Sequence, residues 1–326
     1  MIYRPLGQSG ITASVVAHGT WAIGGWMWGG TDVQKSVRSI HASLDAGVNF
    51  IDTAPAYGLG LSERIVGEAI RGRRDKVILA TKCGLTWHTA KGTFFVDQNG
   101  TRIHRYLGAD SIRYEVEHSL RRLETDYIDL YQTHWQDSTT PIEETMGALL
   151  ELKRQGKIRA IGVSNCTVGQ VRQYRAVGPV DAAQEQYSML HRDLEREYLP
   201  YCGQNHMAML AYSPLANGLL TGKIDPERVF PEDDLRRHNP MFSRESRVRV
   251  REMLDQMQPV ARKYSFSDGQ LAIAWTLAQP GITHALVGAR DENQAAENAW
   301  AGSVLLTAAD VERVNELAQA GALVEA

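Results

Sequence analysis

The chain has 326 residues, of which 43% are hydrophobic and 22% charged, a balance typical of a globular protein with a large core. A net charge of −3 excludes the basic surface by which proteins usually bind nucleic acid. Three cysteines, none in a Cys-x-x-Cys pair, cannot form a disulfide framework and favour a reducing environment. Collagen-like, disordered and disulfide-scaffold proteins are therefore excluded.

Residues 5–31 carry no formal charge, so we tested them as a membrane span. They are rich in glycine and polar side chains, which form helix poorly, whereas a spanning segment must be a helix or part of a closed barrel. A single early cation, Arg4, and the lack of a cleavage site argue against a signal peptide. We therefore expect a cytoplasmic protein that does not bind membranes.

Short runs of β-type residues alternate with helix-type segments along the whole chain. The eight predicted strands are Ser14–Gly19, Asn49–Thr53, Val77–Lys82, Ile128–His134, Ala160–Ser164, Ala182–Tyr187, Met207–Tyr212 and Ala285–Gly288. This alternation implies parallel strands, and eight such units close naturally into a barrel. A doubly wound open sheet usually carries Gly-x-Gly-x-x-Gly after its first strand, and no such motif follows here. We expect an α/β protein with one (β/α)8 TIM-barrel domain over residues 1–326.

Several helix signals and two long segments complete this interpretation. Apolar residues at helical spacing over 112–123 predict a helix before the fourth strand. Thr140-Pro141-Ile142-Glu143 predicts a capping box with proline at the first helical position, and Thr307–Asp310 starts a C-terminal helix. Leu85–Gly108 and Lys223–Ser246 show few signs of strand or helix. They follow strands three and seven on the face where barrels carry active sites, so we expect lids or binding loops.

Four polar residues end or follow predicted strands two to four, namely Asp52, Tyr57, Lys82 and His134. In a barrel they project at the same rim. We expect Lys82 to lower the pKa of Tyr57, because an ammonium stabilises a phenolate, and Asp52 to hold the lysine in place. Tyr57 would then protonate a developing alkoxide while His134 orients the same oxygen. Because no side chain carries hydride, this chemistry requires a nicotinamide or a flavin.

Each of these residues also has a structural interpretation. Asp52 could cap a helix, Lys82 could belong to a buried ion pair, and His134 could be a core histidine. A metal held by Asp52 and His134 is the chemical alternative. Since neither His-Glu-x-x-His nor a repeated His-x-His occurs, we expect no catalytic metal. The joint placement at strand ends favours catalysis.

Two segments in the second half are candidates for phosphate binding. Residues 212–223 resemble a Walker loop only superficially, since three residues rather than four separate the glycines, but they offer backbone N–H groups and Lys223. Arg290, Gln294 and Asn298 repeat every four residues on one face at the start of a helix, where phosphate binds well. The alternative is a solvated helix face, and the position after strand eight favours phosphate.

Five of the seven tryptophans follow predicted strands one, three and four, so they should gather at one rim. They are Trp21, Trp26, Trp28, Trp87 and Trp135. Core packing would scatter them. We expect a pocket wall for an apolar or stacked substrate, built from Trp21, Trp28, Trp87 and Trp135.

Together these residues resemble the aldo-keto reductase superfamily over essentially the whole chain. The motifs are Gly-Thr-Trp at 19–21, Asp52-Thr-Ala-Pro-Ala-Tyr57, Ala80-Thr-Lys82, Asp129-Leu-Tyr-Gln-Thr-His134, the segment Gly156–Asn165, and Gly-Ala-Arg at 288–290 with Gln294 and Asn298. Residues 21–30 and 233–242 further resemble the bacterial general-stress-type branch. The resemblance implies a (β/α)8 barrel that uses NADP(H) without a Rossmann fold and reduces small aldehydes or ketones to alcohols.

The resemblance also implies a role for each matching residue. Asp52, Tyr57, Lys82 and His134 would form the catalytic tetrad, with Tyr57 as general acid and base. The implied cofactor contacts are Thr20 and Trp21 at the nicotinamide end; Ser164, Asn165 and Gln184 at the carboxamide; Tyr212 against the ring; Ser213, Pro214, Leu215, Ala216, Asn217 and Lys223 along the pyrophosphate; Arg290 at the 2′-phosphate; Gln294 and Asn298 near the adenine; and Arg236 as a closing residue. Asp52, Gly288 and Ala289 are further implied cofactor contacts.

Many relatives shape their pocket with a longer loop after the last helix, whereas this sequence stops at Ala326. We therefore expect specificity to depend on the tryptophan-rich loop and on Leu85–Gly108. Two other functions stay open: a non-catalytic sensor that keeps the fold and cofactor, and a cofactor-free lyase or isomerase. We expect a monomer or a small homo-oligomer whose partner is a small carbonyl substrate.

Overall fold

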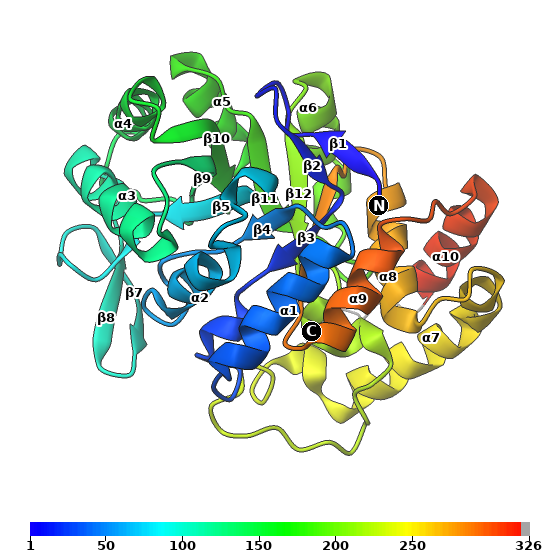
Figure 1. Ribbon diagram of the computed structural model, residues 1–326. Coiled ribbons are helices and arrows are strands. Elements are labelled where there is room, and N and C mark those ends of the chain that lie inside the picture. Colours follow the sequence, from blue (N-terminus) through cyan, green and yellow to red (C-terminus); the bar gives the residue numbers. More distant parts are fainter. Residues whose placement is uncertain (321–326) are drawn as a thin grey trace.

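The core of the molecule is a ring of eight short strands, mostly buried on both faces, as expected of parallel strands covered by helices. The computed structural model describes residues 1–320 and closes these strands into a barrel (Figure 1). In chain order they are β3 (Val16–Gly19), β4 (Phe50–Asp52), β5 (Ile78–Cys83), β9 (Ile128–Thr133), β10 (Ile158–Ser164), β11 (Ala182–Gln186), β12 (Ala208–Tyr212) and β13 (His284–Gly288). Neighbours pair in parallel, and β13 pairs with β3 to close the ring. The predicted (β/α)8 barrel is confirmed.

An N-terminal hairpin, which the sequence pattern did not reveal, packs into the barrel interior. Its strands β1 (Tyr3–Pro5) and β2 (Thr12–Ser14) pair antiparallel. Between them, Leu6 and Ile11 are buried in the cluster that fills the inside of the barrel. The predicted first strand began at Ser14, but this residue belongs to β2, because the chain turns at Val15 before it enters the ring. The hairpin lies at the end of the barrel opposite the long loops (Figure 1).

Helices surround the ring and cover the outer faces of the strands (Figure 1). They are α1 (Val33–Asp45), α2 (Leu61–Ile70), α3 (Ala109–Leu123), α4 (Ile142–Arg154), α5 (Val168–Val177), α6 (Tyr198–Gln204), α7 (Arg244–Lys263), α8 (Asp268–Ala278), α9 (Glu292–Ala301) and α10 (Ala308–Ala320). The helix predicted over 112–123 is confirmed as α3. No helix within residues 1–320 is long and apolar enough to cross a membrane.

The two predicted caps had different outcomes. Thr307 Oγ1 accepts from the backbone N–H of Asp310 at the start of α10, as predicted. The predicted capping box at Thr140 is wrong. Pro141 occupies the cap position of α4, and the Thr140 hydroxyl donates to Asp137 Oδ2 instead. The Thr140 hydroxyl therefore binds the buried Asp137 carboxylate and makes no capping hydrogen bond to the backbone of α4.

The two long segments also differ. We expected little regular structure in Leu85–Gly108, and this was wrong: it forms a sheet of β6 (Leu85–Thr86), β8 (Thr101–Arg105) and β7 (Thr93–Gln98) that projects beside the barrel mouth (Figure 1). Asn99 and Gly100 join β7 to β8 with positive φ angles, the signature of a tight hairpin turn. Lys223–Ser246 is largely irregular as predicted, but α7 begins at Arg244.

Candidate active site

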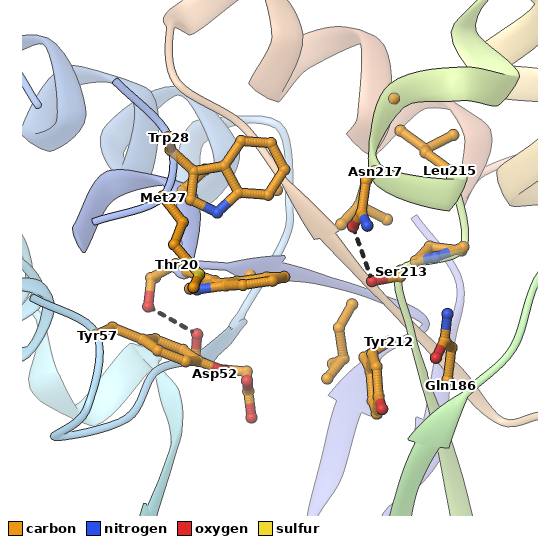
Figure 2. A pocket seen from close by; sticks show the side chains of 18 of the residues that line it. Thr20, Met27, Trp28, Asp52, Tyr57, Gln186, Tyr212, Ser213, Leu215 and Asn217 are labelled. Atoms are coloured by element: carbon orange, nitrogen blue, oxygen red, sulfur yellow. Dashed lines mark hydrogen bonds between the residues drawn. The ribbon is translucent and has the colours of Figure 1, made fainter. Parts of the chain in front are cut away.

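A cavity of about 900 Å³ opens at the C-terminal ends of the barrel strands. Figure 2 shows Asp52 and Tyr57 on one side, Tyr212 and Asn217 on the other, and Trp28 above Tyr57. All of the predicted catalytic and cofactor-binding residues line the cavity except Lys82, Ala216 and Ala289. The three exceptions are buried behind its wall, so the two alanines cannot offer their side chains to a ligand.

Lys82 lies beneath the cavity floor, where β5 delivers it next to the end of β4. Its side chain is 0% exposed. Its Nζ donates to Asp52 Oδ1 at 2.6 Å, to the Thr53 carbonyl at 2.9 Å and to Tyr57 Oη at 3.3 Å. All three ammonium hydrogens thus have acceptors. The structure brings Asp52, Tyr57 and Lys82 together, as the strand-end argument predicted.

The second oxygen of Asp52 is held by two glutamine amides. Gln184 Nε2 donates to Asp52 Oδ2 at 2.9 Å, and Gln132 Nε2 donates to the same oxygen at 3.2 Å. Donors of this kind stabilise a buried carboxylate. Sequence reasoning missed Gln132. The signal was available, because residues alternate across a strand and Gln132 shares the inward face of β9 with Leu130.

The pKa of Tyr57 differs from the sequence-based expectation. Burial and the Asp52 carboxylate raise the pKa of Tyr57, whereas the Lys82 ammonium lowers it. Burial has the largest effect, and the resulting pKa lies above the ordinary 10.0. The expected lowering is therefore wrong as a net effect, although Lys82 does act in the predicted direction. For Lys82, burial lowers the pKa, but Asp52 and Tyr57 together more than offset this, so the pKa lies above 10.5. At neutral pH the phenol is protonated and the lysine is charged.

His134 follows β9 and packs edge-on to Tyr57, with ring centroids 5.7 Å apart. Burial, together with the nearby Lys82 charge, holds the pKa of His134 well below 6.5. The imidazole is therefore neutral at physiological pH. A neutral ring can donate a hydrogen bond without adding a second positive charge beside Lys82.

A connected set of polar groups lies at or near the C-terminal ends of β10, β11 and β12. Asn165 Nδ2 donates to the His134 carbonyl at 2.8 Å, and the Tyr212 hydroxyl donates to Asn165 Oδ1 at 2.9 Å. Ser164 Oγ donates to the backbone carbonyl of Gln184 at 2.7 Å. Asn165 has a positive φ of 51°, a conformation that asparagine tolerates better than most residues. These bonds fix the orientation of the predicted carboxamide-binding residues.

The part of the cavity beside α9 carries cations. Arg290 and Arg228 line the cavity, and neither pairs with a carboxylate among residues 1–320. Arg236 also lines it but forms an ion pair with Asp234 at 2.6 Å. The exposed Lys223 pairs with Glu297 at 3.1 Å. Arginines that have no carboxylate partner suit an anionic ligand such as a dinucleotide.

A buried donor also points to a ligand in this cavity. The indole Nε1 of Trp28 is buried and has no acceptor among residues 1–320. Gln294 and Asn298, which also line the cavity, place amide groups along α9. The donor set therefore fits a group with phosphate and carbonyl oxygens, which is what a nicotinamide dinucleotide presents.

Three of the four tryptophans predicted to form a substrate wall lie on the cavity surface. Trp21, Trp28 and Trp135 line the cavity, as does Trp26. Trp87 does not. It packs against a small cluster around Leu85 and Ile103, to which the cavity-lining Trp135 also belongs.

Comparisons with known proteins agree with this geometry. A family model described as Aldo/keto reductase family matches residues 15–319. The chain belongs to the aldo/keto reductase family. It is therefore an oxidoreductase of a family that works with nicotinamide cofactors. The aldo-keto reductase YhdN of Bacillus subtilis is 46% identical over 297 residues, which are 90% of this chain and 86% of that protein.

Two further relatives cover nearly the whole of this aldo-keto reductase. The NADH-specific methylglyoxal reductase of Escherichia coli is 42% identical over 322 residues, 97% of this chain and 98% of that protein. The structure of a glycerol dehydrogenase from Gluconobacter oxydans is 40% identical, with a TM-score of 0.87 over 97% of this chain and 94% of its own. These relatives support the expected place in a bacterial branch of the family.

Proposed function

We propose that this aldo-keto reductase reduces small aldehydes or ketones to alcohols with NADPH, and that Tyr57 is the proton donor. The observation that carries this proposal is the position of Tyr57 Oη, on the cavity wall and 3.3 Å from the buried Lys82 Nζ. A phenol next to a fixed ammonium can give up a proton toward the cavity and leave a stabilised phenolate.

The raised pKa of Tyr57 suits a reductase. The phenol stays protonated at neutral pH, so it is ready to donate, and burial ensures that the proton leaves only when an alkoxide forms. Asp52 keeps Lys82 charged and correctly oriented. The neutral His134 donates a hydrogen bond to the carbonyl oxygen of the substrate and polarises it before Tyr57 transfers its proton to that oxygen.

NADPH, when bound, supplies the hydride that the side chains cannot. Ser164, Asn165 and Gln184 would hold its carboxamide, with Tyr212 against the ring. Residues 213–217 and Lys223 would lie along the pyrophosphate, with Arg236 closing over it, and Gln294 and Asn298 would contact the adenine. Their shared position on the wall of one cavity supports this assignment.

We assign the preference for NADPH over NADH to Arg290, because the two cofactors differ only in the 2′-phosphate and arginine binds phosphate well. The E. coli relative is NADH-specific, so the assignment needs a direct test. Arg290→Ala should raise the dissociation constant of NADPH about tenfold or more while that of NADH changes little, as measured by nicotinamide fluorescence titration. Equal losses for both cofactors would refute the 2′-phosphate contact.

The substrate would enter between Trp21, Trp28 and Trp135, which form an apolar wall beside Tyr57 and His134. The test of the proposed function is a panel of aldehydes and ketones followed by NADPH absorbance. Steady oxidation of NADPH with at least one small carbonyl supports the proposal. NADPH binding without turnover on the whole panel would favour a non-catalytic sensor, and absence of binding would favour a cofactor-free enzyme.

A further inference from the structure

The loop after β3 forms one wall of the cavity. We call residues 21–30 the tryptophan loop. Trp21, Met27 and Trp28 of this loop face the cavity, and Figure 2 shows Trp28 and Met27 above Tyr57. The Trp21 and Trp28 rings meet edge to face with centroids 5.3 Å apart. The position of this loop therefore sets the space left for a substrate.

Few hydrogen bonds within the tryptophan loop hold its tip in place. Met27 and the glycines at 25, 29 and 30 all have positive φ angles, so this stretch is neither helix nor strand. Its internal backbone bonds close only a small turn, in which Trp28 N and Gly30 N both donate to the Gly25 carbonyl. A glycine-rich turn of this kind needs external contacts to keep one conformation.

Those external contacts come mainly from one side chain. Arg290 Nη1 donates to the Trp28 carbonyl at 2.9 Å, and Arg290 Nη2 donates to the Gly30 carbonyl at 2.9 Å. The one other hydrogen bond that joins residues 25–30 to a distant element of the described chain runs from Leu235 N to the Met27 carbonyl at 3.2 Å. Arg236 adds a cation–π contact with Trp28 at 5.3 Å.

We propose that Arg290 is a positioning residue for the substrate wall: by binding the Trp28 and Gly30 carbonyls it fixes the tryptophan loop, so carbonyl recognition depends on it even when the cofactor has no 2′-phosphate. The inference rests on the proposed carbonyl reduction and adds a second role to Arg290. A guanidinium has five N–H donors, and the two bonds to the loop leave others for a phosphate. An arginine at this position is therefore compatible with either cofactor.

The first test needs neither cofactor nor turnover. Hydrogen–deuterium exchange read by mass spectrometry compares the cofactor-free wild type with Arg290→Ala and Arg290→Lys. Arg38→Ala serves as the matched control, because Arg38 joins α1 to Glu292 of α9 at 2.7 Å but does not line the cavity. We expect amides of the tryptophan loop to exchange about tenfold faster in Arg290→Ala, less so in the lysine variant, and at the wild-type rate in the control. Unchanged exchange in Arg290→Ala would overturn the proposal.

The second test separates the two roles of Arg290. With saturating NADH, which lacks the 2′-phosphate, Arg290→Ala should raise the KM for the carbonyl about tenfold while kcat changes much less, because the loop binds substrate but performs no proton transfer. Arg38→Ala should leave both constants unchanged. A variant that loses only NADPH affinity, with its carbonyl KM intact, would contradict the positioning role. Absence of turnover in the wild type would instead contradict the proposed function, and the exchange experiment would still decide the inference.

Discussion

Replacement of Lys82 by methionine tests the buried ion pair beneath the cavity. Methionine matches the length of the lysine stem but removes the ammonium, which leaves the Asp52 carboxylate only 3% exposed and without its cation. Breaking a buried ion pair costs about 3–5 kcal/mol. Gln132 and Gln184 still donate to Asp52 Oδ2, so we expect the lower end, a loss of about 3 kcal/mol in the free energy of unfolding.

Urea denaturation followed by circular dichroism measures this loss, and a second variant isolates its cause. Asp52→Asn combined with Lys82→Met removes both charges, so it should recover much of the stability lost in Lys82→Met alone. Reduction should stay abolished in both variants, because nothing stabilises the Tyr57 phenolate. A single variant as stable as the wild type, or a double variant less stable than the single one, would refute the buried-charge argument.

Two further predictions concern pH. The rate of carbonyl reduction should be level from about pH 7 to 9 and fall only above pH 10, because the pKa of Tyr57 is raised above 10.0 and that of His134 lies well below 6.5. A fall centred near pH 8 would show that the effect of Lys82 on the pKa of Tyr57 outweighs the effect of burial. Burial raises the pKa of Glu185 from 4.5 to about 8, so this residue binds its proton more tightly in the folded state than in the unfolded state. The protonated Glu185 therefore contributes stability below pH 4.5, and this contribution is lost as the pH rises toward 8. The free energy of unfolding of Glu185→Gln should therefore exceed that of the wild type at pH 8, by up to about 5 kcal/mol at 1.36 kcal/mol per pH unit. This difference between the two proteins should disappear as the pH falls to 4.5. If the difference stayed constant across this pH range, the argument would be contradicted.

The barrel could be predicted because its evidence is periodic and repeated. Eight buried strand-type runs separated by helix-type segments leave few alternatives, and each strand was found near its expected position. The N-terminal hairpin escaped prediction because its strands have three residues each, too short for a pattern. The sheet after β5 was missed although Asn99-Gly100 is a hairpin signal, since its flanking residues are mostly polar or exposed.

The site shows a different limit. Sequence could place Lys82, Asp52 and Tyr57 at one rim, because strand ends meet there. It could not give the sign of the Tyr57 pKa, which depends on how far burial outweighs a neighbouring charge. It also could not show that Trp87 does not line the cavity, because its packing near Leu85 and Ile103 involves a sheet that was not predicted.

Tyr57→Phe tests the central claim most directly. The phenylalanine ring keeps the packing against His134 and removes only the hydroxyl that Lys82 contacts. We predict that kcat/KM for carbonyl reduction falls by about 10²–10⁴-fold while the dissociation constant of NADPH, measured by fluorescence titration, stays as in the wild type. Turnover close to that of the wild type would contradict the assignment of Tyr57 as the proton donor.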